Sequence, residues 1–133
     1  MARKFFVLRT NSLVSREGYS TLLSFGNDNQ IIIPFPVLDQ LEKRTHEYSQ
    51  KGKNASAILE YLSSFKIDAL LSEEGVKQKN GSTLRIMKEC PDIEIELSGL
   101  NDFDRKCLQI VRRLQQANRK STVILVTKNP ALR

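Results

Sequence analysis

Four polar side chains lie at positions where the sequence pattern predicts a functional site. Arg9 and Asn129 each follow a short apolar run. Gln40 lies on a predicted helix, and Asp104 lies in the first turn of another. Mg²⁺ and Mn²⁺ prefer oxygen ligands, and in hydrolytic sites carboxylates position the ions that activate water. Asp104 is the one carboxylate among the four, and Arg9 would place a cation in the same cleft.

The charges of Arg9 and Asp104 decide whether this cleft attracts a metal ion. A unit charge pair about 4 Å apart is worth about 4 kcal/mol at an effective dielectric constant near 20, and a divalent ion doubles that energy. Arg9 therefore repels a metal about as strongly as Asp104 attracts it. Gln40 and Asn129 offer only neutral amide oxygens. We predict no ordinary two-metal hydrolysis here, with Asp104 as a metal ligand at most.

Three short apolar runs must form the sheet that positions these residues. Residues 5–8, 31–33 and 122–127 are too short for helices and rich in β-forming residues. Such continuous apolar runs are typical of strands that are buried on both faces of a parallel sheet. In open α/β sheets, ligands bind at the carboxyl ends of the strands. Arg9 and Asn129 occupy that position in this interpretation.

Amphipathic segments alternate with these runs. One helix is expected after Pro36, and another from Ala55 after a break at residues 51–53, with Asn54 as its cap. A short helix is expected over residues 19–25. The longest helix begins at Asn101 or Asp102, and its apolar stripe comprises Phe103, Cys107, Leu108, Val111 and Leu114.

Turn signals and two half-exposed strands complete the expected fold. Asn80-Gly81 is a strong hairpin-turn signal. Apolar residues alternate with charges at 84–86 and at 93–97, which indicates half-exposed strands at a sheet edge. Strands that alternate with helices predict an α/β fold, a three-layer α/β/α sandwich with a mainly parallel central sheet.

Composition limits the partners and the location. The 133 residues suit one domain over 1–133, and the chain carries a formal charge of +6. That charge favours an acidic partner, nucleic acid before membrane, although many small domains are mildly basic. No apolar run approaches the ~18 residues of a membrane span, so no membrane role is expected. Cys90 and Cys107 lack metal-ligand spacing and indicate free thiols in the cytoplasm. Because the chain stops directly after a strand, we expect a fragment of a longer protein.

Five ordered segments carry a family resemblance over nearly the whole chain. They are Phe-Val-Leu-Arg-Thr-Asn-Ser-Leu, Ile-Pro-Phe-Pro-Val-Leu-Asp-Gln-Leu, Asn-Ala at 54–55, residues 104–108, and Ile-Leu-Val-Thr-Lys-Asn-Pro-Ala-Leu-Arg. In this order the chain resembles a PIN domain, most narrowly the N-terminal PIN domain of bacterial PhoH-like ATPases. The resemblance implies a parallel sheet flanked by helices and a Mg- or Mn-dependent nuclease, usually of RNA. It also implies a possible homo-oligomer and an ATPase module in the same parent chain.

The chain departs from the acidic pattern of that family. The resemblance implies aspartate at Arg9, glutamate at Gln40 and aspartate at Asn129, and it implies a basic residue at Ser56. Of the expected acidic set only Asp104, the candidate catalytic residue, is present. The family's metal site is therefore degenerate in this sequence.

Three interpretations remain open. In the first, the domain is an RNA- or protein-binding or regulatory module that holds no cofactor, and Arg9 pairs with Asp104. In the second, it is an active Mg- or Mn-dependent endoribonuclease that recruits other nearby acids such as Asp39, Glu42 or Asp102. In the third, it is an engineered inactive form, which Gln40 and Asn129 fit but Arg9 and Ser56 do not.

Single-stranded RNA is one partner that the first interpretation allows, beside an ATPase module of the same parent chain. A guanidinium matches two phosphate oxygens, so Arg9 could meet a phosphate where relatives place metal. Charged residues of this kind are also common as simple solvated surface groups. The residues expected to bind substrate are Arg9, Thr10, Asn11, Lys43, Arg105, Thr127 and Lys128.

Overall fold

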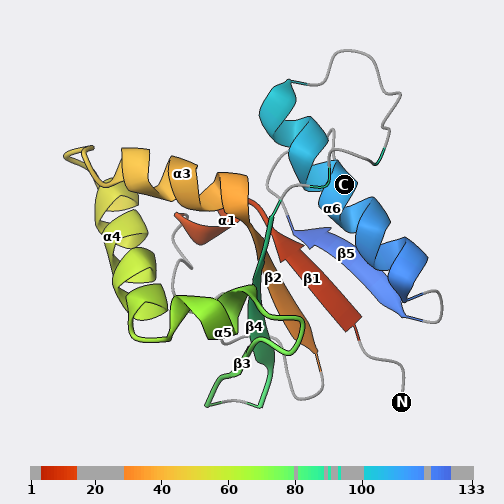
Figure 1. The fold of residues 1–133 in the computed structure, drawn as a ribbon. Helices are drawn as coiled ribbons and strands as arrows, with labels where there is room; N and C mark the ends of the chain where they lie inside the picture. The colour runs from red at the N-terminus through yellow and green to blue at the C-terminus, as the bar shows by residue number, and fades with distance from the viewer. Residues whose placement is uncertain are drawn as a thin grey trace.

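Five strands and five helices are present in the described part of the protein, a computed structural model (Figure 1). The structure describes residues 4–14, 29–79, 81–88, 90, 93, 101–118 and 121–126, with the backbone alone at 11 and 12. The strands are β1 (Lys4–Leu8), β2 (Gln30–Pro34), β3 (Val76–Lys77), β4 (Thr83–Met87) and β5 (Thr122–Val126). The helices are α1 (Thr10–Leu13), α3 (Phe35–Arg44), α4 (Gln50–Ser63), α5 (Ile67–Leu71) and α6 (Asp102–Ala117).

The sheet is mainly parallel, with the strand order β3-β4-β2-β1-β5. β1 pairs in parallel with both β2 and β5, and β2 pairs in parallel with β4. Only the short β3 runs antiparallel, as the partner of β4. The carboxyl ends of β1, β2, β4 and β5 consequently lie along one edge of the sheet. This arrangement confirms the predicted α/β fold with a mainly parallel sheet.

Helices cover both faces of this sheet. Phe5 and Val7 of β1 pack with Ile110 and Leu114 of α6. On the opposite face, the core contains side chains from α3, α4 and α5 together with Ile33 of β2. Side chains of successive strand residues point to opposite faces, so an apolar run can fill two cores at once. Figure 1 shows α6 on one side of the strands and α3 to α5 on the other.

Two predictions about the strands were wrong in detail. β5 pairs only with β1 among the described strands, and its residues are half-buried or exposed, so it is not a fully buried strand. β4 has the predicted alternation, with Leu84 and Ile86 buried between half-buried residues, but it lies inside the sheet and β3 takes the edge. The hairpin turn itself is where the sequence indicates it, and Gly81 has a positive φ of 89°. Strand position depends on the neighbouring strands, which a local pattern does not contain.

The predicted break at residues 51–53 was also wrong. α4 begins at Gln50, and the Ser49 hydroxyl caps it by accepting a hydrogen bond from Gly52 N–H at 3.3 Å. Gly52 is therefore inside the first turn of the helix. A Cβ at this position would lie 2.1 Å from the carbonyl oxygen of Glu47. The glycine allows the helix to start against the preceding turn, so it does not end a segment.

Two further predictions concern segments beyond the described ranges. The expected helix over residues 19–25 lies outside the described residues. The expected strand over 93–97 does too, apart from Ile93. Within the described ranges, every helix is too short or too polar to pass through a bilayer.

Candidate functional site

Arg9 is the first residue beyond β1, and the backbone fixes it firmly. Its N–H donates to the carbonyl oxygen of Val126 at 3.2 Å, which continues the pairing of β1 with β5 by one residue. Its backbone is extended, with φ −98° and ψ 162°, and it forms the N-cap of α1. The side chain is only 10% exposed. The end of the strand thus carries a buried guanidinium.

Asp104 meets this guanidinium from the opposite direction. It lies in the first turn of α6, where the Asn101 side chain caps the helix by accepting from the Asp104 N–H at 2.8 Å. Its carboxylate forms an ion pair with Arg9 and is 12% exposed. The positive end of a helix dipole also favours a carboxylate at this point. The predicted contact between Arg9 and Asp104 is present.

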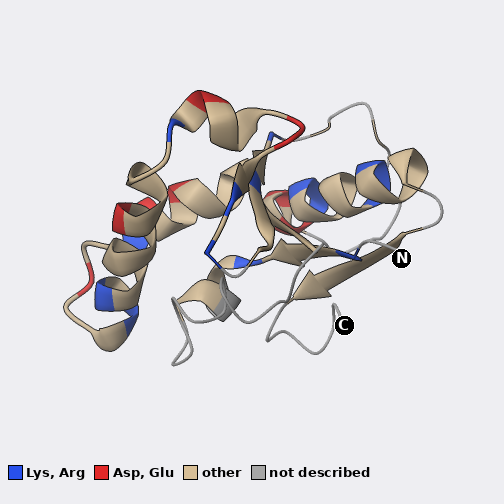
Figure 2. Ribbon diagram, turned by 90° about the horizontal axis from the view of Figure 1, so that it is seen from below, with Lys and Arg blue, Asp and Glu red and all other residues tan. Residues whose placement is uncertain are grey.

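Two side chains of α6 that the sequence did not assign to the site lie beside the ion pair. The Arg9 guanidinium lies 5.1 Å from the centre of the Phe103 ring, within the range of a cation–π contact. Cys107 lies one turn after Asp104 and is 1% exposed. Residues three apart on a helix share a face, so this spacing could have placed Cys107 beside Asp104. In Figure 2, the acidic start of α6 is red and basic residues farther along are blue.

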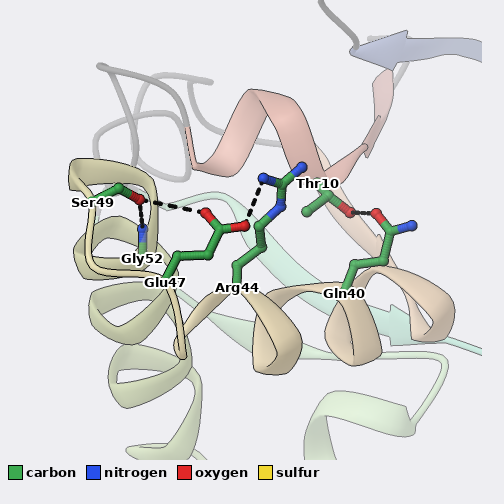
Figure 3. Close-up of polar contacts among 6 residues, drawn as sticks. All are labelled: Thr10, Gln40, Arg44, Glu47, Ser49 and Gly52. Carbon is green, nitrogen blue, oxygen red and sulfur yellow. Dashed lines mark hydrogen bonds and ion pairs between the residues drawn. The ribbon is translucent and has the colours of Figure 1, made fainter.

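Gln40 reaches the same edge of the sheet through Thr10. The Thr10 hydroxyl donates to Gln40 Oε1 at 2.8 Å (Figure 3). This hydrogen bond joins α1, which directly follows Arg9, to the middle of α3. The side chain of Asn11 is not described, and Thr127, Lys128 and Asn129 lie outside the described residues.

The described donors do not fit a divalent metal ion. The Asp104 carboxylate is engaged by a cation, and the amide oxygen of Gln40 accepts from Thr10. In the parts of the chain that the structure describes, no three His, Cys, Asp or Glu side chains gather in an arrangement that could hold a metal. Mg²⁺ and Mn²⁺ need several hard, preferably anionic oxygen ligands. The neutral Arg9–Asp104 pair does not supply them.

The acids proposed as substitutes lie elsewhere. Asp39 and Glu42 line a surface depression of about 360 Å³ together with Lys43 and His46, and neither Arg9 nor Asp104 borders it. Asp102 has a side chain that is 79% exposed and pairs with Lys106 Nζ at 3.1 Å. These carboxylates are solvated charges on the outer faces of α3 and α6.

Two of the basic residues expected to bind substrate, Lys43 and Arg105, differ in exposure. Lys43 is exposed on α3, and it borders a second depression of about 220 Å³ with Gln40, Arg44 and Glu47. Arg105 is half-buried on α6, next to Asp104 in sequence. Lys43 therefore borders the same depression as Gln40, which accepts the hydrogen bond from Thr10.

Cys107, which lies beside the ion pair, has a thiol pKa well above the ordinary value. Burial raises the pKa of its thiol to about 11, with smaller opposing effects from the charges of Arg9 and Asp104. The thiolate is the reactive form of cysteine. We expect Ellman's reagent at pH 8 to modify Cys90, which is half-buried, and to reach Cys107 only after denaturation. Replacing Cys90 with serine should remove the fast reaction. A fast reaction that instead disappears in Cys107→Ser would contradict this description.

The same pKa shift has a consequence for stability. The thiol of Cys107 ionises near pH 8.5–9 in the unfolded chain but near 11 in the folded protein. Below about pH 8 it is neutral in both states and contributes no pH dependence. Above pH 9 the unfolded chain loses this proton first, so the free energy of unfolding should fall until the folded thiol ionises.

Comparison with known families identifies the architecture. A family model described as the PIN domain matches residues 6–133. No curated protein gives a significant match to the sequence. The match includes the last three residues of β1 and all of β2, α6 and β5, and therefore both residues of the ion pair.

Proposed function

The chain belongs to the PIN domain family, and we propose that it is a member that binds single-stranded RNA without metal-dependent cleavage. The observation that carries this proposal is the buried Arg9–Asp104 ion pair. It occupies the sheet edge where the family resemblance implies a cluster of acids and a metal. The family supplies the RNA-related role, and the ion pair removes the charge on which its metal chemistry depends.

The electrostatics of the ion pair favour binding over cleavage. A cluster of four carboxylates without metal repels phosphate, whereas a paired arginine and aspartate carry no net charge. The chain as a whole has a formal charge of +6. Lys43 borders the same depression as Gln40, and Arg105 follows Asp104 on α6, so each could supply a cation to a bound phosphate. Phosphate neutralisation by such side chains dominates nucleic-acid affinity.

The narrower assignment concerns the branch of the family. We infer a PhoH-like member whose parent chain carries an ATPase module, which the order of the five resembling segments supports. We also infer a reducing, cytoplasmic location, which the free thiols of Cys90 and Cys107 support. Regulation of the ATPase module by bound RNA would then be the role of the domain.

One experiment tests binding and cleavage together. Labelled single-stranded RNA is incubated with the chain and Mn²⁺, with and without chelator, and analysed for both retention and length. We expect RNA to bind at ~50 mM salt, to remain intact, and to dissociate steeply as salt increases. Chelator should change neither result.

The control variant is Asp104→Asn. Chelator-sensitive cleavage that is lost in this variant would establish the active endoribonuclease and overturn the proposal. Absence of RNA binding at ~50 mM salt would also overturn the proposal, because the positive charge of the chain would then contribute only to solubility.

A further inference from the structure

The turn that joins α3 to α4 carries an aromatic side chain in full contact with solvent. We propose that this turn, residues 45–49, is a second RNA contact, in which a base stacks on Tyr48 while Lys51 and Lys53 meet neighbouring phosphates. The inference rests on the proposed RNA-binding function and extends it to a surface outside the ion-pair site.

Tyr48 differs sharply from the other tyrosine that the structure describes. Tyr48 has a relative exposure of 108%. Tyr61 packs edge-on against Phe65 with ring centres 5.2 Å apart, and its hydroxyl donates to Gln78 Oε1 at 2.7 Å. Tyr48 therefore contributes a flat apolar ring to the surface with no role in the core. Such rings are the platforms on which single-stranded bases stack, with little dependence on base identity.

Side-chain contacts among the residues on either side of Tyr48 hold the turn in place. Figure 3 shows Arg44 Nη1 and the Ser49 hydroxyl directed at the carboxylate of Glu47, at 3.0 Å from Oε1 and 3.4 Å from Oε2 respectively. Ser49 Oγ also accepts from Gly52 N–H, which ties the turn to the start of α4. The carboxylate of Glu47 thus joins both sides of the turn. A fixed turn presents its aromatic ring without the ordering cost of a mobile loop.

The charge around this turn suits a polyanion. Residues 43–53 contain four lysines and arginines and one acid, Glu47, whose carboxylate is paired with Arg44. Lys51 and Lys53 are exposed in the first turn of α4. A depression of about 660 Å³ lies beside Tyr48, and Lys53 and Glu60 both border it. The surplus of positive charge combined with an exposed ring fits single-stranded nucleic acid better than an acidic peptide, which has no bases to stack.

Two depressions that share Glu47 connect this turn with Gln40, beside the ion-pair site. Gln40, which contacts Thr10, borders the 220 Å³ depression with Glu47. Glu47 in turn borders the depression beside Tyr48. Gln40 and Arg44 are four positions apart, about 6 Å along the axis of α3, and Arg44 Nη1 lies 3.0 Å from Glu47 Oε1 in the turn. One short oligonucleotide could therefore reach from the Thr10–Gln40 contact to Tyr48.

The chain contains no tryptophan, so Tyr48→Trp creates a single fluorescent reporter at the proposed stacking position. We expect oligouridylate to quench this emission saturably, with the same midpoint that fluorescence anisotropy of labelled RNA gives. Heparin, a polyanion without bases, should displace RNA and leave the emission unquenched. Equal quenching by heparin would overturn the stacking assignment.

Two sets of variants separate ring from charge. Tyr48→Ala should weaken RNA binding about 5- to 100-fold, as loss of one stacked base predicts. Tyr48→Phe keeps the ring and should bind as the unmodified chain does. The Lys51→Gln, Lys53→Gln double variant should reduce the slope of log affinity against log salt by about 1.4, or ~0.7 for each phosphate that is no longer neutralised. Since all three side chains are exposed, melting temperatures should stay unchanged and confirm folding.

Different binding results would overturn this inference and the proposed function. RNA that binds the unmodified chain and the Tyr48→Ala variant equally would overturn this inference and leave the proposed function standing. RNA that binds neither protein would overturn the proposed function itself.

Discussion

Replacing Asp104 with alanine should destabilise the protein by about 3–5 kcal/mol, because it removes the carboxylate partner of a buried ion pair while the Arg9 guanidinium stays buried. The two side chains are only 10% and 12% exposed, so solvent cannot take over the missing interaction easily. The helix cap survives the change, since Asn101 binds the backbone N–H of residue 104. For a domain of this size the loss corresponds to a fall in melting temperature on the order of 10–20 °C.

Asp102→Ala is the matched control for this change. Asp102 lies in the same helical turn, but its side chain is 79% exposed and its partner is Lys106. An exposed pair of this kind contributes at most about 1 kcal/mol. The double variant Arg9→Met, Asp104→Leu should recover much of the stability, since a well-packed apolar pair often replaces a buried ion pair at little cost. Equal melting temperatures for the two alanine variants would show that the buried pair contributes no more than the exposed one.

The contact between Arg9 and Asp104 could be predicted from the sequence because each residue has a strong local marker. Arg9 follows a short apolar run that can only be a strand, and Asp104 follows the helix-capping residue Asn101. In a parallel sheet the carboxyl ends share one edge, which brings such positions together. Residue order placed both side chains near this edge, and the family resemblance indicated that they belong to one site.

Other features depend on contacts that no local pattern contains. β5 has the same apolar character as β1, yet it lies beside one described strand where β1 lies between two. A glycine at position 52 suggests a break between two helices. Only its approach to the Glu47 carbonyl shows why glycine is needed within α4. Ile110 was likewise missed as a core residue of α6, although its spacing of three from Cys107 and four from Leu114 places it on the same buried face. The Tyr48 turn gave no signal beyond its polarity, since exposure of one ring is a tertiary property.

The second large expected effect is the recovery of a metal site. The triple variant Arg9→Asp, Gln40→Glu, Asn129→Asp would supply four acids with Asp104, where the family resemblance implies them. Arg9→Asp alone changes the local charge by two units but leaves too few carboxylates for two ions. We expect the triple variant to bind Mg²⁺ or Mn²⁺ and to be stabilised by mass action, while the unmodified chain responds little.

The same variant should be less stable than the unmodified chain when no metal is added. Four clustered carboxylates repel one another, and the variant no longer has the ion pair that joins β1 to α6. Thermal melts of both proteins, with and without metal, measure both the loss of stability in the variant and its stabilisation by added metal. Equal metal responses of the two proteins would show that these four residues do not form one site.

The most direct test of the central claim is a calorimetric titration of Mn²⁺ into the unmodified chain and into Asp104→Asn. A site closed by the Arg9–Asp104 ion pair should give no saturable heat in either protein, and the two titrations should superimpose. Saturable binding of one or two ions to the unmodified chain, abolished by Asp104→Asn, would contradict the account. In that case Asp104 would be a metal ligand, and the ion pair would open to admit the metal.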